Sequence, residues 1–197
     1  MNRTRALLLL VLGLAAAAVA AAATYAAYVA TTQNNRNSVA AGSVALSDND
    51  SGTAMFTTLG SAKPGDTETS CIKVRYDGTL ASSVRLYATV TGGLAPYLTL
   101  TVTRGSDPSP AFDNCATFAN DATDYIGAGP GVVYSRTLSG FPTTYATAIV
   151  DPAVGGGTES WVATEEHVYK IQATLGASTA AQGQTSTAAF TWEARNQ

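Results

Sequence analysis

The chain contains one histidine, His167, for any chemistry that needs an imidazole. Glu165 and Glu166 precede it and are the nearest candidate co-ligands. Catalytic zinc normally has three protein ligands, often from a His-Glu-x-x-His helix, and that motif is absent. We therefore expect no metal site and no cofactor. His167 shares strand parity with Tyr169 and Ile171, which predicts a histidine packed at the rim of a core.

Nucleophilic catalysis is equally poorly supported. A Ser-His-Asp triad would need the same histidine, and no Gly-x-Ser-x-Gly elbow occurs, since Ser160 lacks its flanking glycine. A catalytic Cys71 or Cys115 would also need a histidine as its base, and the chain has only one. A pair of carboxylates stays open, although nothing singles one out. The sequence therefore predicts that the protein is not an enzyme and has no catalytic residues.

Two acidic stretches resemble fragments of calcium loops. Asp48-Asn49-Asp50-Ser51-Gly52 has acidic residues two apart, but a twelve-residue calcium loop would need Glu where Leu59 stands. An Asx turn is the preferred interpretation, because Asp, Asn and Gly all suit turns. Residues 120–124 form a second acidic loop with the same weak claim. Weak calcium binding stays open.

The N-terminus determines where any such chemistry would take place. Arg3 and Arg5 precede the apolar run 6–23, which is followed by a junction of small residues. This order is typical of a secretory signal peptide, here a helix over 1–26. The preferred cut follows Ala26, with Thr24 at −3 and Ala27 as the new N-terminus. Cuts after Ala22, Ala23 or Ala27 are alternatives, and so is retention as a membrane anchor.

Composition after residue 26 narrows the list of partners. The remaining 171 residues suit one domain, predicted over 38–197 behind a short segment, 27–37. They carry nine basic against fourteen acidic side chains, a formal net charge of −5. Without a basic stripe to neutralise phosphates, nucleic acid is excluded as a partner. We expect the protein to contact a membrane only through an uncleaved signal peptide.

Cys71 and Cys115 are the only cysteines. In an exported protein an even, small number of cysteines favours a disulfide. Such a bridge would close a loop of about 45 residues and stabilise the fold by roughly 4 kcal/mol through the entropy of the unfolded chain. Two buried free thiols, or a shared metal site, are the alternatives.

Period-two alternation of apolar and polar residues predicts β-strands through most of the chain after the signal peptide. Seven or more short antiparallel strands, each apolar on one side, pack best as two sheets face to face. We expect a hairpin at Asp77-Gly78, another turn at Pro64-Gly65-Asp66, and long loops over 105–160 around a strand near 131–137. The predicted apolar stripes are Ile72, Val74 and Tyr76; Val84, Leu86, Ala88 and Val90; Leu98, Leu100 and Val102; Tyr169, Ile171, Ala173 and Leu175; and Ala188, Phe190, Trp192 and Ala194.

Several motifs follow one another in a fixed order. They are Thr24-Tyr25-Ala26-Ala27-Tyr28, Ala41-Gly42-Ser43-Val44-Ala45-Leu46 with Asp48-Asn49-Asp50-Ser51-Gly52, Pro64-Gly65-Asp66, Asp77-Gly78-Thr79-Leu80, Gln182-Gly183 and Ala189-Phe190-Thr191-Trp192-Glu193-Ala194. In this order they resemble the TasA/camelysin family of exported bacterial proteins, whose signal peptides are cut by a SipW-type peptidase. The match covers the signal, the first half of the domain and the last strand, but not 105–160. The Ala/Gly bias and the cysteine pair suggest a branch from high-GC Gram-positive bacteria.

The resemblance implies a jelly-roll-like sandwich, secreted to the extracellular matrix or the cell surface. It also implies self-association into biofilm fibres, in which each subunit inserts its mature N-terminal segment into a neighbour. Here that donor would come from 27–37, with Ala27, Tyr28 and Val29 at its start; a plain linker is the alternative. A signal peptidase is the other implied partner. A surface binding module using the 105–160 loops, with Tyr125, Tyr134, Tyr145 and Trp161, and a camelysin-like metallopeptidase are the competing functions.

Overall fold

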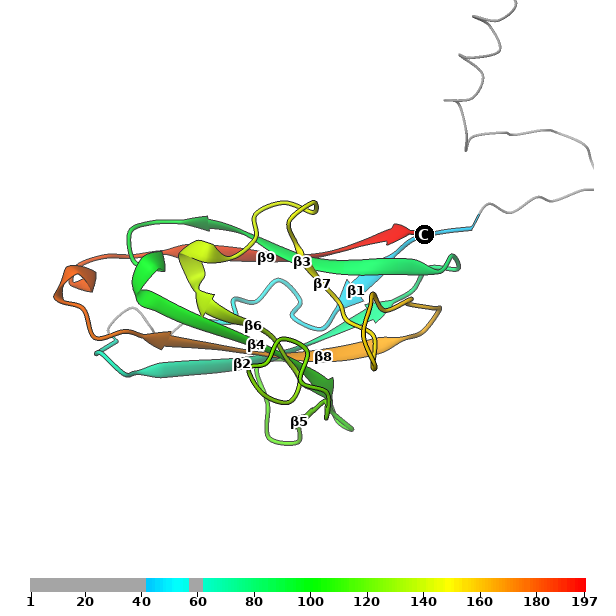
Figure 1. Ribbon diagram of the computed structural model, residues 1–197, viewed down its shortest axis with the longest axis horizontal. Coiled ribbons are helices and arrows are strands. Elements are labelled where there is room, and N and C mark those ends of the chain that lie inside the picture. Colours follow the sequence, from blue (N-terminus) through cyan, green and yellow to red (C-terminus); the bar gives the residue numbers. More distant parts are fainter. Residues whose placement is uncertain (1–41, 57–61) are drawn as a thin grey trace, which may run out of the picture. The chain divides into compact units, whose positions relative to one another are not determined.

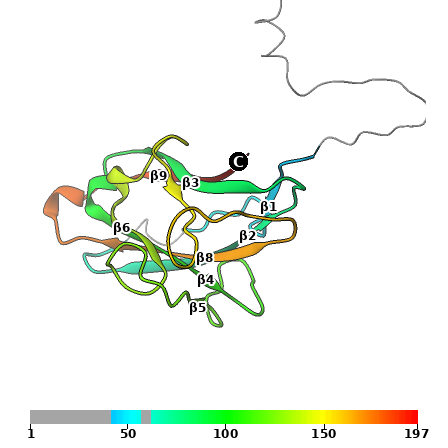
Figure 2. The same ribbon diagram turned by 45° about the vertical axis from the view of Figure 1, so that its right-hand side comes forward.

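The described part of the protein is an antiparallel β-sandwich, as the sequence predicts (Figure 1). The computed structural model describes residues 42–56 and 62–197. One layer has the strand order β1-β2-β8-β4-β5, with β6 also paired to β4, and the other has the order β7-β3-β9. The two layers stay separate when the molecule is turned (Figure 2). The strands are β1 (Leu46–Asp48), β2 (Thr67–Tyr76), β3 (Ser82–Thr91), β4 (Leu98–Ser106), β5 (Ala119–Asn120), β6 (Val132–Thr137), β7 (Ile149–Val150), β8 (Glu166–Leu175) and β9 (Thr187–Asn196).

The core lies between the layers and is built from the predicted stripes. Alternate residues of β2, β3, β4 and β8 are buried, because every second side chain of a strand points to the same face. Short 3-10 helices, η2 (Ala95–Tyr97), η3 (Leu138–Gly140) and η4 (Thr179–Ala181), close one end. The last stripe differs: Phe190 and Trp192 of β9 are only half-buried.

The Asp77-Gly78 hairpin is a wrong prediction. Strand β2 pairs with β1 and β8, whereas β3 belongs to the other sheet, so the chain crosses between layers at this turn. The Tyr76 hydroxyl fills the corner, where it bonds to the Leu80 carbonyl and lies 2.8 Å from Ser82 Oγ. A Cβ on Gly78 would fall 2.3 Å from that hydroxyl. The absence of a side chain at Gly78 therefore leaves space for the Tyr76 hydroxyl and does not indicate a hairpin turn.

The other turn and the loop region follow the sequence more closely. At Pro64-Gly65 the chain reverses with Asp66 N donating to the Lys63 carbonyl, and Gly65 takes φ 91°. Within 105–160 the predicted strand is β6, and Tyr134 and Trp161 are buried anchors. Among the described residues no helix is long and apolar enough to cross a bilayer.

The signal peptide 1–26, its junction at Thr24, Ala26 and Ala27, and the candidate donor segment 27–37 lie outside the described residues.

Candidate functional site

Two features are candidates for function: a buried polar cluster at one end of the sandwich, and an apolar groove on its open side. The cluster begins with Arg104. Arg104 continues the inward-facing row of β4 formed by Leu98, Leu100 and Val102. Its guanidinium therefore enters the space between the sheets, and only 5% of the residue is exposed. A charge in this position is costly unless it is paired and hydrogen-bonded.

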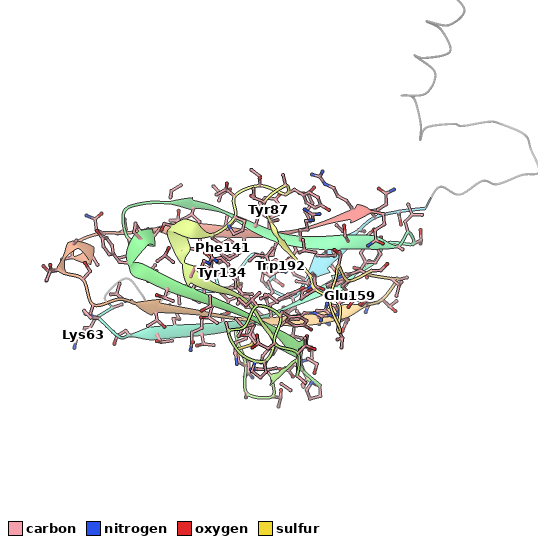
Figure 3. The ribbon with its side chains drawn as sticks, viewed as in Figure 1. Lys63, Tyr87, Tyr134, Phe141, Glu159 and Trp192 are labelled. Carbon is pink, nitrogen blue, oxygen red and sulfur yellow. A yellow bond between two sulfur atoms is a disulfide. The ribbon has the colours of Figure 1, made fainter. Side chains whose placement is uncertain are left out.

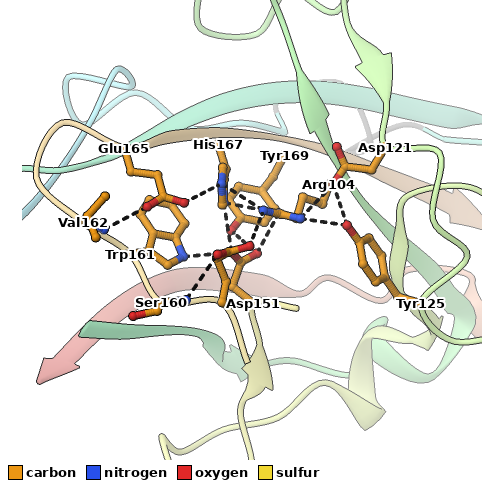
Figure 4. Close-up of polar contacts among 11 residues, drawn as sticks. Arg104, Asp121, Tyr125, Asp151, Ser160, Trp161, Val162, Glu165, His167 and Tyr169 are labelled. Carbon is orange, nitrogen blue, oxygen red and sulfur yellow. Dashed lines mark hydrogen bonds and ion pairs between the residues drawn. The ribbon is translucent and has the colours of Figure 1, made fainter. Parts of the chain in front are cut away.

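Asp151, directly after β7, supplies that pairing and is the centre of the cluster (Figure 4). Its Oδ1 accepts from the Tyr169 hydroxyl at 2.7 Å and lies 3.3 Å from Arg104 Nε. Its Oδ2 accepts from Trp161 Nε1 at 2.8 Å and lies 2.9 Å from His167 Nδ1. Four donors from three chain segments, namely β4, β8 and the loop before β8, therefore converge on one carboxylate that is 4% exposed.

An outer ring of groups surrounds Arg104. Asp121 Oδ2 lies 3.0 Å from Nη1, Tyr125 accepts from the same nitrogen at 2.7 Å, and Glu159 Oε2 lies 3.4 Å from Nη2. Burial opposes the charge on Arg104, but the attraction of Asp151 and Asp121 outweighs it and raises the pKa of the guanidinium above its ordinary value. The arginine thus stays ionised and joins loop 121–125 to the core.

His167 lies where its strand parity predicts, packed between the sheets against the Trp161 ring with 4.2 Å between ring centroids. Nδ1 is hydrogen-bonded to Asp151, and Nε2 lies 2.9 Å from Arg104 Nη2 and 3.2 Å from Glu165 Oε1. Glu166 points to the opposite face and bridges to Lys73 and Arg75. A zinc site does not fit these residues, since a guanidinium occupies the place beside the imidazole that a cation would need. No cluster of three metal-ligating side chains occurs in 42–56 and 62–197.

Ser160 is not placed to act as a nucleophile. Its Oγ lies 3.4 Å from Gln197 Oε1, and the His167 nitrogens already face Asp151, Arg104 and Glu165. The Asp151–His167 pair resembles the orienting half of a triad, but among the described residues no hydroxyl or thiol is bonded to Nε2. What this cluster does with the contacts described is pair and orient buried charges within the core.

Tyr169 gives the cluster a measurable pH dependence. Burial, with the Asp151 carboxylate beside it, raises the pKa of Tyr169 well above 10, whereas an unfolded tyrosine ionises near pH 10. Above that pH the unfolded chain has lost a proton that the folded protein keeps, so stability falls as pH rises. Above pH 10 we expect the free energy of unfolding of Tyr169→Phe to decline less steeply than that of the wild type, by about 1.4 kcal/mol per pH unit. Urea unfolding from pH 8 to 11 measures it; parallel declines in the two proteins would contradict it.

The first acidic loop is built of Asx turns, and the second is closed by a carboxylate that accepts from backbone N–H groups three and four residues on. Asp48 Oδ1 accepts from Asp50 N at 3.2 Å, and Asp50 Oδ1 accepts from Gly52 N at 2.6 Å. In the second loop, Asp124 Oδ1 accepts from Gly127 N and Ala128 N. These carboxylates therefore bond to their own backbone, as the sequence predicts for turns.

Cys71 and Cys115 form the predicted disulfide, with 5.4 Å between their Cα atoms. Cys71 stands on the outer face of β2, opposite in parity to Ile72, and is nevertheless buried because the loop that carries Cys115 covers it. The bridge ties loop 107–118 to the sheet.

The second candidate feature is a groove of about 860 Å³ between the layers. On one side it follows β9, whose inward side chains Ala188, Phe190 and Trp192 line it; Figure 3 shows Trp192 pointing into the space between the sheets. On the other side are Ile72 and Val74 of β2 and the segment 46–56. Leu94, Leu98 and Leu138 line its far end. The half-burial of β9 follows from this groove.

Each strand beside the groove has an edge that no described strand pairs along its full length. Strand β9 pairs with β3 along its whole length, and no described strand pairs with its other edge. On β2, β1 covers only Val74–Tyr76. Two polar atoms in the groove lining, Trp192 Nε1 and Ser186 Oγ, are buried without a hydrogen-bond partner. Unpaired strand edges and orphaned donors beside apolar surface are the features of a site that accepts an extended chain.

Sequence reasoning missed the Arg104–Asp151 cluster. The available signal was parity: Arg104 continues the row of Leu98, Leu100 and Val102, and a charge at an inward position requires a partner. Nothing in the sequence identifies Asp151 as that partner. No family model matches the chain, and no curated protein shows significant similarity to it.

Proposed function

We propose that this protein is a structural subunit of the extracellular matrix or cell surface that self-associates by strand addition in the groove beside β9. The carrying observation is that groove, with its apolar lining, the free edge of β9 and the orphaned Trp192 Nε1. An added strand would pair its backbone with β9, bury the half-exposed side chains and offer a carbonyl to the indole. The disulfide agrees with folding in an oxidising compartment, which supports secretion.

The occupant is the mature N-terminal segment of a second copy, beginning Ala27-Tyr28-Val29. Cleavage after Ala26 leaves 15 residues before Gly42. At about 3.3 Å per residue they reach roughly 50 Å, whereas a ten-residue strand such as β9 spans about 33 Å. Tyr28 and Val29 supply apolar side chains, and the polar residues 33–37 would lie nearer the donor subunit. Length and chemistry both suit the groove.

Chain direction favours a second copy over the subunit's own segment. Gly42 lies against Leu80, and Gln197 N donates to the Ala81 carbonyl, so Gly42 is at the end of the sandwich where β9 finishes. A segment leading straight back from Gly42 would run parallel to β9, whereas all described strand pairs are antiparallel. For segment 27–37 to run antiparallel to β9 of its own subunit, residues 38–41 would have to lead back along the strand to Gly42. Four residues span only about 14 Å, which is less than the length of β9. The segment of a second copy, stacked end to end with the first, can enter the groove antiparallel to β9 without such a return.

The test compares purified chains 27–197 and 38–197. We expect 27–197 to form filaments in electron micrographs and 38–197 to sediment as a monomer with unchanged thermal stability. A synthetic 27–41 peptide should bind 38–197, and a scrambled peptide should not. Filaments from 38–197 would overturn the assignment of the segment.

A substitution in the groove tests the acceptor side. Ala188→Arg places a charge in the groove lining, and Thr89→Arg places the same charge on the exposed outer face of neighbouring β3. We expect Ala188→Arg to abolish filaments and peptide binding, and Thr89→Arg to retain both. Equal assembly by the two folded variants would exclude the groove.

A further inference from the structure

The two ring nitrogens of His167 face different partners (Figure 4). Nδ1 lies 2.9 Å from Asp151 Oδ2, and an ionised carboxylate only accepts, so Nδ1 carries a proton and donates it. Arg104 Nε, which is 3.2 Å from Nδ1 and 3.3 Å from Asp151 Oδ1, then donates to the carboxylate. Only Nε2 is left to gain or lose a proton.

Nε2 lies between a donor and an acceptor that it cannot satisfy together. Arg104 Nη2, at 2.9 Å, only donates and needs the lone pair of a neutral ring. Glu165 Oε1, at 3.2 Å, only accepts and needs a protonated ring. The neutral imidazole therefore accepts from Arg104 with its one Nε2 lone pair and has no proton to donate to Glu165. The imidazolium bonds to Glu165, and Arg104 Nη2 keeps Glu159, 3.4 Å away.

The charges around the ring come from every element packed against it. Arg104 belongs to β4, Asp151 follows β7, Glu159 and Glu165 belong to the loop before β8, and Asp121 faces Arg104 from the segment after β5. Two phenols, Tyr169 and Tyr125, complete the set. Four carboxylates face one guanidinium, so the cluster has a formal excess of three negative charges when the ring is neutral. A proton on Nε2 reduces that excess.

Glu165 connects the ring to the neighbouring turn. Its Oε2 accepts from Val162 N at 2.8 Å, and its own N–H donates to the Val162 carbonyl at 3.1 Å. The turn holds Thr164 at φ 71°, a costly conformation for a β-branched residue, and exposes 55% of Val162. The Glu165 carboxylate is thus a bridge between His167 and a turn that is also held by Thr164 N donating to the Tyr76 carbonyl and Tyr76 N donating to the Glu165 carbonyl, both at 2.9 Å.

We propose that His167 is a proton-operated latch for the turn Val162–Glu165. Protonation at Nε2 fixes Glu165 between the ring and Val162 N and closes the latch. Loss of that proton makes Nε2 an acceptor for Arg104 and frees the Glu165 carboxylate from the ring. Among side chains, imidazole is the one that most readily changes charge under mild conditions, so the latch is tested by comparing mildly acidic with mildly alkaline solution. This device does not depend on the groove or on assembly.

The single histidine makes the proton on the ring directly observable. In the protein without a histidine tag, nitrogen NMR reports one imidazole. We expect the neutral ring to be the Nδ1–H tautomer, and Glu165→Gln to lower the doubly protonated fraction relative to the wild type at the same acidic pH. A neutral ring in the Nε2–H tautomer, or the same doubly protonated fraction in Glu165→Gln and the wild type, would overturn the latch.

Amide exchange tests the turn itself. We expect the protection factor of Val162 N–H, corrected for intrinsic exchange rates, to be about tenfold higher at pH 5 than at pH 8, since a charge-assisted hydrogen bond is gained. Glu165→Gln should abolish this difference. Glu166→Gln, one residue away on the opposite face, should retain it. A pH-independent protection factor in the wild type, or the same loss in both variants, would contradict the proposal.

Discussion

Asp151→Ala is expected to lower the free energy of unfolding by about 3–5 kcal/mol, the largest effect of any single substitution in the cluster. The alanine leaves Arg104 buried without its central counterion. It also leaves the Trp161 indole and the Tyr169 hydroxyl without their acceptor. Buried donors that lose a partner cost their full desolvation, which is why the change exceeds the value of one hydrogen bond. Urea unfolding followed by tryptophan fluorescence measures it.

Glu159→Gln is the matched control for Asp151→Ala. Glu159 touches the same guanidinium, but at 3.4 Å and with 24% of its side chain exposed, so we expect a loss below about 1 kcal/mol. Asp151→Asn should fall between the two, because it keeps the acceptor oxygen and loses the charge. Similar losses for Asp151→Ala and Glu159→Gln would show that Asp151 is not the centre of the cluster.

Removing the disulfide by Cys71→Ala with Cys115→Ala is expected to cost about 4 kcal/mol, on the chain-entropy relation for a sequence separation of 44. The covered position of Cys71 means that the same change also loosens loop 107–118 from β2. The loss should appear as a lower urea midpoint and as faster proteolysis within 107–118.

The single variants separate the bridge from the packing of its sulfurs. Cys71→Ala alone breaks the bridge and should be nearly as unstable as the double variant, and reduced wild-type protein should match both. Non-reducing mass spectrometry of the wild type should find no alkylatable thiol. A reduced wild type as stable as the oxidised protein would contradict the entropic contribution.

Local sequence pattern determined the strands well because alternation requires no knowledge of the partner strand. The stripes in β2, β3, β4 and β8 are buried on the predicted faces, and His167 follows the parity of Tyr169. The disulfide followed from cysteine number and the predicted export signal. Asp77-Gly78 failed as a hairpin because the same turn chemistry also serves a crossing between sheets, and strand alternation does not say which sheet the next strand joins.

Near neighbours and composition were therefore enough to predict the alternation of each strand, its inward face and the covalent bridge. Only the packed fold shows that Arg104 meets Asp151, 47 positions later, and that no described strand pairs with the outer edge of β9 beside an apolar groove. Charge pairing and sheet order depend on contacts between segments distant in the chain. Their energies are set by burial, which exists only after the layers have packed.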